Sequence, residues 1–186
     1  MRATGSFLAG LAAGLLLSVS AAGQNWSVGV NVLDCAELGT MNVEASMGVA
    51  RRWTVGAGAK YNPFTWEVDG RPVADRQRSF EAGARWWPWH IYSGWWMAGK
   101  VRYQEYNVGG ISSPASTEGD RYGGGLSAGY SYMLNPHLNL DLGLGLWSGV
   151  DRYTVYECVR CGRTVGGGER FFVLPSDIML SVSYIF

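Results

Sequence analysis

The sequence predicts an all-β protein, namely an eight-stranded antiparallel up-and-down transmembrane β-barrel with long outer loops and short periplasmic turns. Three observations predict this fold. Apolar and polar residues alternate with period two, the period of a β-strand, through eight segments of about ten residues. Aromatic residues gather at the ends of these segments. Tight turns alternate with long connections, as they do in outer-membrane barrels.

Composition agrees with this fold class. A length of 186 residues suits one domain. The chain has 27 Gly, 9 Trp and 10 Tyr, and only 16% of its residues are charged, against about 25% in soluble domains. The 15 basic and 15 acidic residues leave no net charge, which argues against nucleic acid as a partner.

Residues 1–22 predict a cleavable signal peptide. Arg2 supplies a positive charge, residues 7–19 form an apolar core, and Ser20-Ala21-Ala22 offers a small-residue cleavage site. A transmembrane anchor is the alternative, but the apolar core is short for a span of about 20 residues. We therefore expect residues 23–186 to form one exported outer-membrane β-barrel domain.

Eight segments carry the strand pattern. In the first three, Val28, Val43 and Val55 lie on the apolar faces, and Gly, Asn and Ser are frequent on the polar faces. The clearest segment is 138–148, in which Leu occupies every second position. Each segment is near the 9–11 residues that a tilted membrane strand needs. The expected strands cover about residues 24–34, 41–50, 53–62, 78–87, 94–105, 121–133, 138–148 and 176–186.

The connections alternate in length. Those at residues 51–52, at Pro88 and at Asn135-Pro136 are tight. The others are rich in Gly, Pro and charge. After export, an even number of strands leaves both termini in the periplasm, with the tight turns there and the long loops outside. The expected long loops are residues 63–77, 106–120 and 149–170.

The apolar faces are expected to point outward, toward lipid. In a soluble barrel such as a lipocalin they would surround an internal ligand. Here the polar faces are dominated by Gly, Ser and Asn, which fit a narrow interior where isolated charges can pair. A soluble β-sandwich is the other alternative, but it needs no common register in eight segments. The predicted interior ion-pair network is Glu44, Lys60, Glu81, Arg85, Lys100, Arg102, Arg121, Asp141 and Asp177.

Two aromatic girdles are predicted around a band of Val, Leu and Ala, as is typical of membrane-spanning barrels. The predicted periplasmic girdle includes Trp26, Trp53, Trp86, Trp95, Tyr130, Tyr184 and Phe186. The predicted outer girdle comprises Tyr61, Phe64, Tyr103, Tyr106, Tyr122, Phe171 and Phe172.

Several stretches resemble a family of small outer-membrane β-barrels of Bacteroidota, the domain of unknown function 3575 family. They are NVLDCAELGTMNVEASMGVARRWTV, KYNPFTW, ARWWPW, LGLGLW, CVRCG and the aromatic C-terminus. The resemblance covers most of the mature chain, and KYNPFTW and CVRCG are its more specific parts. It implies an exported barrel without assigned chemistry, with some relatives associated with fimbrial surface systems. Asp34-Cys35 departs from the usual pattern of the first strand.

Cys158 and Cys161 predict a disulfide in the last outer loop. An oxidising compartment favours this over half of a zinc site, because the chain has only one further cysteine, Cys35. Cys35 lies at the end of the first strand, which neighbours the last strand in a closed barrel. It therefore remains a competing partner for either cysteine.

The sequence predicts no catalytic, cofactor-binding or metal-binding residue. A lipid-modifying outer-membrane enzyme is the alternative, but His90 and His137 lie in the tight turns without an evident acid partner. A pore is excluded because eight strands enclose an interior that side chains fill. We therefore expect a structural anchor or surface-loop interaction module, surrounded by outer-membrane lipid and lipopolysaccharide, with other envelope or fimbrial proteins as partners.

Overall fold

The computed structural model describes residues 25–37, 39–68, 70–110, 113–159 and 161–186. The expected signal peptide and the expected domain boundary at residue 23 lie outside these ranges. Most of the described chain is β-strand, so the all-β class is confirmed. The elements are β1 (Trp26–Asn31), α2 (Val32–Ala36), β2 (Met41–Ala50), β3 (Trp53–Asn62), β4 (Thr65–Val68), β5 (Arg71–Trp86), β6 (Gly94–Gly109), β7 (Ser116–Asn135), β8 (Leu138–Cys158) and β9 (Cys161–Ile185).

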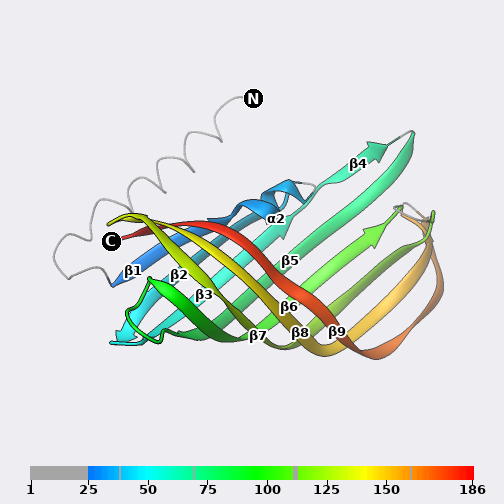
Figure 1. The fold of residues 1–186 in the computed structure, drawn as a ribbon. Helices are drawn as coiled ribbons and strands as arrows, with labels where there is room; N and C mark the ends of the chain where they lie inside the picture. The colour runs from blue at the N-terminus through cyan, green and yellow to red at the C-terminus, as the bar shows by residue number, and fades with distance from the viewer. Residues whose placement is uncertain (1–24, 38, 69, 111–112, 160) are drawn as a thin grey trace.

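Eight of the nine strands in the described ranges pair antiparallel in a closed ring (Figure 1). The order is β1, β2, β3, β5, β6, β7, β8 and β9, and β9 pairs back with β1. β4 lies outside the ring and, among the described residues, pairs with β5 as one arm of a hairpin. Each of the eight segments expected from the sequence overlaps one strand of the ring, and β4 is an additional strand.

The prediction of three long outer loops is wrong. Most of residues 63–77, 106–120 and 149–170 is strand, because β5 to β9 continue outward and turn in hairpins. The charged residues that suggested loops pair across neighbouring strands instead, as Arg152 does with Glu169 at 2.8 Å. We call this extension beyond β1, β2 and β3 the outer sheet (Figure 1). It consists of β4 and residues 71–77, 105–109, 116–120, 151–158 and 161–170.

β1 ends at Asn31, three residues before the expected end at residue 34. The Asn31 Oδ1 atom accepts a hydrogen bond from the N–H of Leu33, at 3.2 Å, which starts α2. The same atom accepts the N–H of Leu180 in β9, at 3.1 Å. The amide of Asn42 in β2 binds both the N–H and the C=O of Asn31, at 2.6 and 2.8 Å. Side-chain amides thus replace the strand ladder where β1 gives way to α2.

The strands are staggered around the ring. A path that starts at Trp26 can be followed from each residue to its partner on the next strand. It passes through Met47, Val55, Ala84, Gly99, Leu126 and Leu146 and reaches Pro175. Trp26 itself lies beside Phe186, whose N–H donates to its C=O at 2.9 Å. The path therefore ends eleven residues from where it would close without stagger. At about 3.3 Å per residue and about 4.8 Å between strands, this stagger tilts the strands by about 40–45°.

The two faces of the ring have opposite polarity. On β8, Leu142 and Leu144 point outward with 46% and 68% of their surface exposed, while Asn139 and Asp141 point inward with 1% and 6% exposed. The same alternation holds on the other ring strands, where Ser, Thr and Asn are buried and Val, Leu and Met are exposed. The prediction that the apolar faces point outward is therefore confirmed.

Aromatic side chains fill the interior near the tight turns. Trp87, Tyr92 and Trp96 pack there with Met179 and Ile185. The indole Nε1 of Trp87 donates to Thr54 Oγ1 at 3.1 Å, and the hydroxyl of Tyr92 donates to the C=O of Asn25 at 3.1 Å. This cluster closes that end of the ring with bulky side chains.

Candidate functional site

Glu81 is the centre of the interior charge cluster. Its carboxylate accepts from Lys100 Nζ at 3.0 Å and from Arg102 Nε at 2.8 Å. These three residues lie on the adjacent strands β5 and β6, and Glu81 and Arg102 are direct cross-strand neighbours. The side chains are about nine-tenths buried, so each charge depends on its partners in place of water.

Two further pairs flank this cluster. Arg85 of β5 binds Glu44 of β2 over the intervening strand β3 at 3.2 Å, and its guanidinium lies 4.2 Å from the centre of the Trp96 indole ring. Lys60 binds Asp34 of α2 at 2.6 Å. Asp34 was not among the predicted interior charges, because its segment was expected to be strand. The short helix α2 turns this carboxylate inward, where Lys60 can reach it.

Asp141 is buried without a basic partner among the described residues. It accepts hydrogen bonds from the hydroxyls of Ser131 on one side and Ser183 on the other, the latter at 2.8 Å. Asp177 lies at a bulge in β9, opposite residues Gly143 to Gly145, and its side chain is outside the described part. Within the described ranges, Asp141 therefore adds no ion pair to the interior cluster.

Asp151 forms a second buried cluster that the sequence analysis missed. It has 0% exposure and accepts from the Tyr106 hydroxyl at 2.8 Å and from Arg170 Nε at 2.9 Å. Arg121, a predicted interior residue, lies 3.4 Å from the same carboxylate, and its guanidinium stacks 3.8 Å from the Tyr106 ring centre. The alternation of inward residues continues past Trp147 to Asp151 and could have revealed this cluster.

The cavities beside Glu81 inside the ring are small. Two of them, with volumes of about 20 and 30 Å³, share Glu44, Glu81 and Lys100 in their walls. Ligand sites in proteins typically have volumes of about 300–1,000 Å³. The interior charges of the described chain therefore bind one another at close range and leave no space of substrate size in these two cavities.

The aromatic residues near the tight turns form a belt. Trp53 pairs with Trp86 across β3 and β5. Trp95 packs edge-on against Tyr130 with ring centres 5.3 Å apart. The remaining residues of this predicted girdle lie where the first and last strands meet, and Tyr184 packs against Phe186 at 5.0 Å while Trp26 is 45% exposed.

The predicted outer girdle is corrected at two positions. Tyr106 and Phe172 are buried inside, with 4% and 8% of their surface exposed. Tyr106 binds Asp151, and Phe172 packs on Trp147 with ring centres 4.7 Å apart. The strands continue past Tyr106 and Phe172. Both side chains therefore keep the inward direction that the strand alternation gives them.

The outer face changes from apolar to charged within one step of the strand alternation. One row of cross-strand neighbours is largely aromatic, and the next outward-facing row is wholly charged. The aromatic row is Phe80, Tyr103, Tyr122, Val150 and Phe171. The charged row is Arg78, Glu105, Asp120, Arg152 and Glu169. The hydroxyl of Tyr103 joins the two rows through Glu105 and Asp120, at 3.1 and 3.0 Å.

A family model described as "Protein of unknown function (DUF3575)" matches residues 9–186. The chain belongs to the DUF3575 family. The resemblance seen in the sequence motifs is thereby confirmed over nearly the whole chain. No curated protein matches the sequence.

The cysteines of this DUF3575 protein lie in two places. Cys158 and Cys161 are cross-strand neighbours where the β8–β9 hairpin turns. Cys35, at the end of α2, is an exposed free thiol that receives a long hydrogen bond from the Asn42 amide, at 3.5 Å. The disulfide between Cys158 and Cys161 stays a prediction, and the register places the two residues where it would form.

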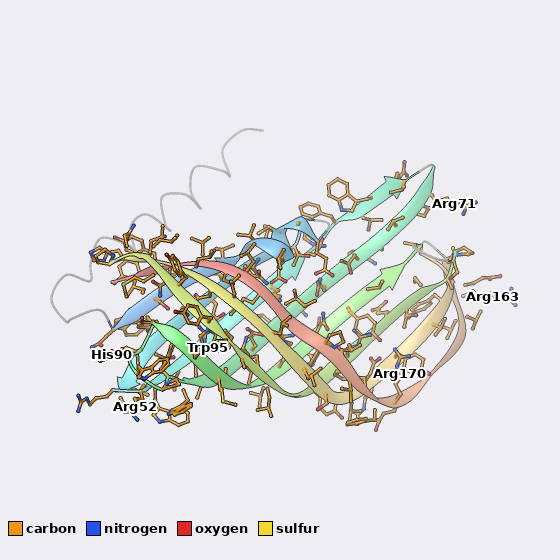
Figure 2. The ribbon with its side chains drawn as sticks, viewed as in Figure 1. Arg52, Arg71, His90, Trp95, Arg163 and Arg170 are labelled. Atoms are coloured by element: carbon orange, nitrogen blue, oxygen red, sulfur yellow. The ribbon has the colours of Figure 1, made fainter. Side chains whose placement is uncertain are left out.

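The two histidines of this DUF3575 protein lie at the opposite end. His90 is exposed in the β5–β6 turn, where Figure 2 labels it near Arg52. The His137 ring binds the C=O of Ile185 at 2.9 Å and stacks on Tyr184. In the described ranges neither histidine contacts a carboxylate, and no group of three or more His, Cys, Asp or Glu side chains has a metal-binding arrangement. No helix in these ranges is long and apolar enough to cross a membrane.

Proposed function

We propose that the chain is an integral outer-membrane β-barrel that anchors the outer sheet at the cell surface, where the sheet binds another envelope component. The observation that carries the proposal is the reversed polarity of the ring. Exposed Leu, Val and Met cover its outside, and buried Ser, Asn and charged residues occupy its inside. Water would penalise this arrangement, whereas lipid on the outside favours it.

The dimensions of the apolar band support insertion in a bilayer. On β6, the stretch from Trp95 in the aromatic belt to Tyr103 in the outer aromatic row is nine residues long, counting both ends. A tilted transmembrane strand needs about 9–11 residues. Arg71 and Arg163 lie near the hairpin tips farthest from the tight turns (Figure 2).

The outer sheet supports a role in binding rather than catalysis. β7, β8 and β9 have 20, 21 and 25 residues, about twice the length that a bilayer requires. Strands of this length hold a rigid surface away from the membrane. With the signal peptide expected from the sequence, the tight turns face the periplasm and the outer sheet faces the medium.

Membrane fractionation tests the anchor. We expect the protein to resist extraction with carbonate and to migrate differently on a gel before and after heating, as closed barrels do. Recovery in the soluble periplasmic fraction would contradict the proposal. Crosslinking from native membranes should capture a partner through the outer sheet. Lipid A and phospholipid profiles of cells with and without the protein should match, and a protein-dependent change in acyl chains would favour the enzyme alternative.

A further inference from the structure

The outer stretch of β9 has a neighbouring strand on one side only. β8 pairs with β9 as far as Cys158 and Cys161. β1 pairs with β9 only up to the pair of Asn31 and Ser181, and the Asn31 amide extends this contact to Ile178. Within the described ranges, residues 162–174 of β9 form no backbone hydrogen bond on that second side.

The hydrogen bonds near the seam fix which backbone groups face this edge. The N–H and C=O of one residue in an antiparallel strand point to the same side, and successive residues alternate. The N–H of Leu180 points to Asn31, so Met179 points to β8. Met179 pairs with Gly143 and Ser176 with Gly145, two positions apart on β8. The backbone groups of Ser176 therefore also point to β8. Pro175 therefore faces the free edge.

Pro175 agrees with this assignment, because proline has no N–H and occurs in sheets mainly on edges. Counting outward from Pro175 in steps of two, Val173, Phe171 and Glu169 also direct their N–H and C=O groups to the free edge. Pro175 marks the inner end of the edge, because no strand can receive a hydrogen bond there.

The side chains of β9 leave this edge open. Sheet edges are often blocked by charged side chains. Here three charged side chains of β9 are held toward β8 instead. The pairs are Glu169 with Arg152 at 2.8 Å, Arg170 with Asp151 at 2.8 Å, and Arg163 with Glu157 at 3.5 Å. On the outward face, Phe171 and Val173 are 72% and 57% exposed.

We propose that this edge of β9 binds an extended polypeptide segment of another envelope protein, which adds to the outer sheet as a further strand. Unpaired main-chain N–H and C=O groups recognise another main chain, and no other ligand class satisfies a row of them. The neighbouring Phe171 and Val173 select a segment with apolar residues at alternate positions. The inference rests on the proposed function, and it supplies the site and the chemical class of the partner.

A synthetic peptide with the sequence of residues 147–156 is a suitable probe. This part of β8 already matches β9, since Val150 lies opposite Phe171 and Arg152 opposite Glu169. With the full chain in lipid bilayers, we expect rapid hydrogen exchange at the amides of Phe171 and Glu169. The peptide should protect these amides, and a scrambled peptide should not.

Two variants at one position give the matched control. Glu169→Pro removes an N–H that faces the edge and leaves the ladder to β8 intact, whereas Glu169→Ala removes only the carboxylate. We expect Glu169→Pro to weaken peptide binding by at least about tenfold and Glu169→Ala to retain it, because only the first blocks the edge.

Three results would overturn the inference. They are amides already protected without peptide, amides that stay exchangeable at saturating peptide, and equal binding by the two variants. Protection that appears without peptide and rises with the protein-to-lipid ratio would assign the edge to a second copy of the chain. Failure to insert into bilayers would contradict the proposed function instead, so the two failures are distinguishable.

Discussion

The indole of Trp96 in β6 lies directly over Gly143 in β8, so that a Cβ at position 143 would stand 2.8 Å from the ring. Gly143→Ala should therefore force the indole to move and destabilise the fold by about 1–3 kcal/mol. In a Trp96→Phe background the smaller ring should reduce the destabilisation caused by Gly143→Ala. A double-mutant cycle should therefore show a coupling energy between the two substitutions. Thermal unfolding measures both. Gly124→Ala is the control, because its Cβ would meet nothing closer than 3.6 Å.

Leu142 tests the lipid-facing band. It lies on the outward face of β8, and arginine at the middle of a bilayer costs about 2–4 kcal/mol in such barrels, against about 0–1 kcal/mol near the interface. Leu142→Arg should therefore lower stability in bilayers much more than Leu134→Arg, since Leu134 lies at the tight-turn end. Equal losses in denaturant unfolding would contradict the assigned depth of β8.

Glu81 tests the interior charges. Glu81→Ala leaves Lys100 and Arg102 buried without their shared carboxylate, and loss of one partner from a buried pair typically costs about 3–5 kcal/mol. Glu169→Ala removes an exposed pair and should cost at most about 1 kcal/mol. Thermal unfolding compares the two variants. A Glu81→Ala protein as stable as Glu169→Ala would show that the interior charges are well hydrated.

The cysteines give a prediction about covalent structure. Cross-strand pairing of Cys158 and Cys161 and the expected oxidising compartment favour a disulfide between them. Mass mapping of the non-reduced protein should find this link, and a thiol reagent should label Cys35 alone. A link from Cys35 to either of the other cysteines would replace this pairing.

The Asp75 carboxyl should make the folding stability of the protein depend on pH. Burial raises the pKa of the Asp75 carboxyl, which lies in the outer sheet, and burial together with Asp75 and Asp34 raises that of Glu37. A carboxyl whose pKa is higher in the folded than in the unfolded state stabilises folding only while it is protonated, and this stability is lost as pH rises through the folded pKa. Asp75→Asn should thus raise the unfolding temperature at about pH 7 and leave it unchanged at about pH 3, where both forms are neutral. A rise of equal size at both pH values would contradict the sign.

Period-two alternation predicted the ring strands because the pleat of a strand fixes which side chains share a face. Leu142 and Asn139 could be assigned to opposite faces from this rule alone. The same rule continues through Asp151, but a composition rich in Gly and charge is also typical of loops. In that stretch the composition favoured loops, so the sequence did not predict the outer sheet.

The partners of the interior charges were harder to predict than their direction. Glu81 and Arg102 are neighbours only because β5 and β6 pair in one register, which the sequence pattern does not specify. Lys60 binds Asp34 because Asn31 ends β1 and starts a helical turn. A strand pattern cannot foresee that turn, since it depends on the amide of Asn42 in the next strand.

The contact between Trp26 and Phe186 also has a consequence for the kinetics of assembly. It joins the first and last strands, so the loop that must close to form it contains nearly the whole described chain. Contacts between neighbouring hairpins close far shorter loops and are expected to form earlier. The closing step therefore comes last, and until then both β1 and β9 expose a bare edge along the lipid-facing part of the sheet. The rate at which this seam closes sets how long the chain is exposed to aggregation.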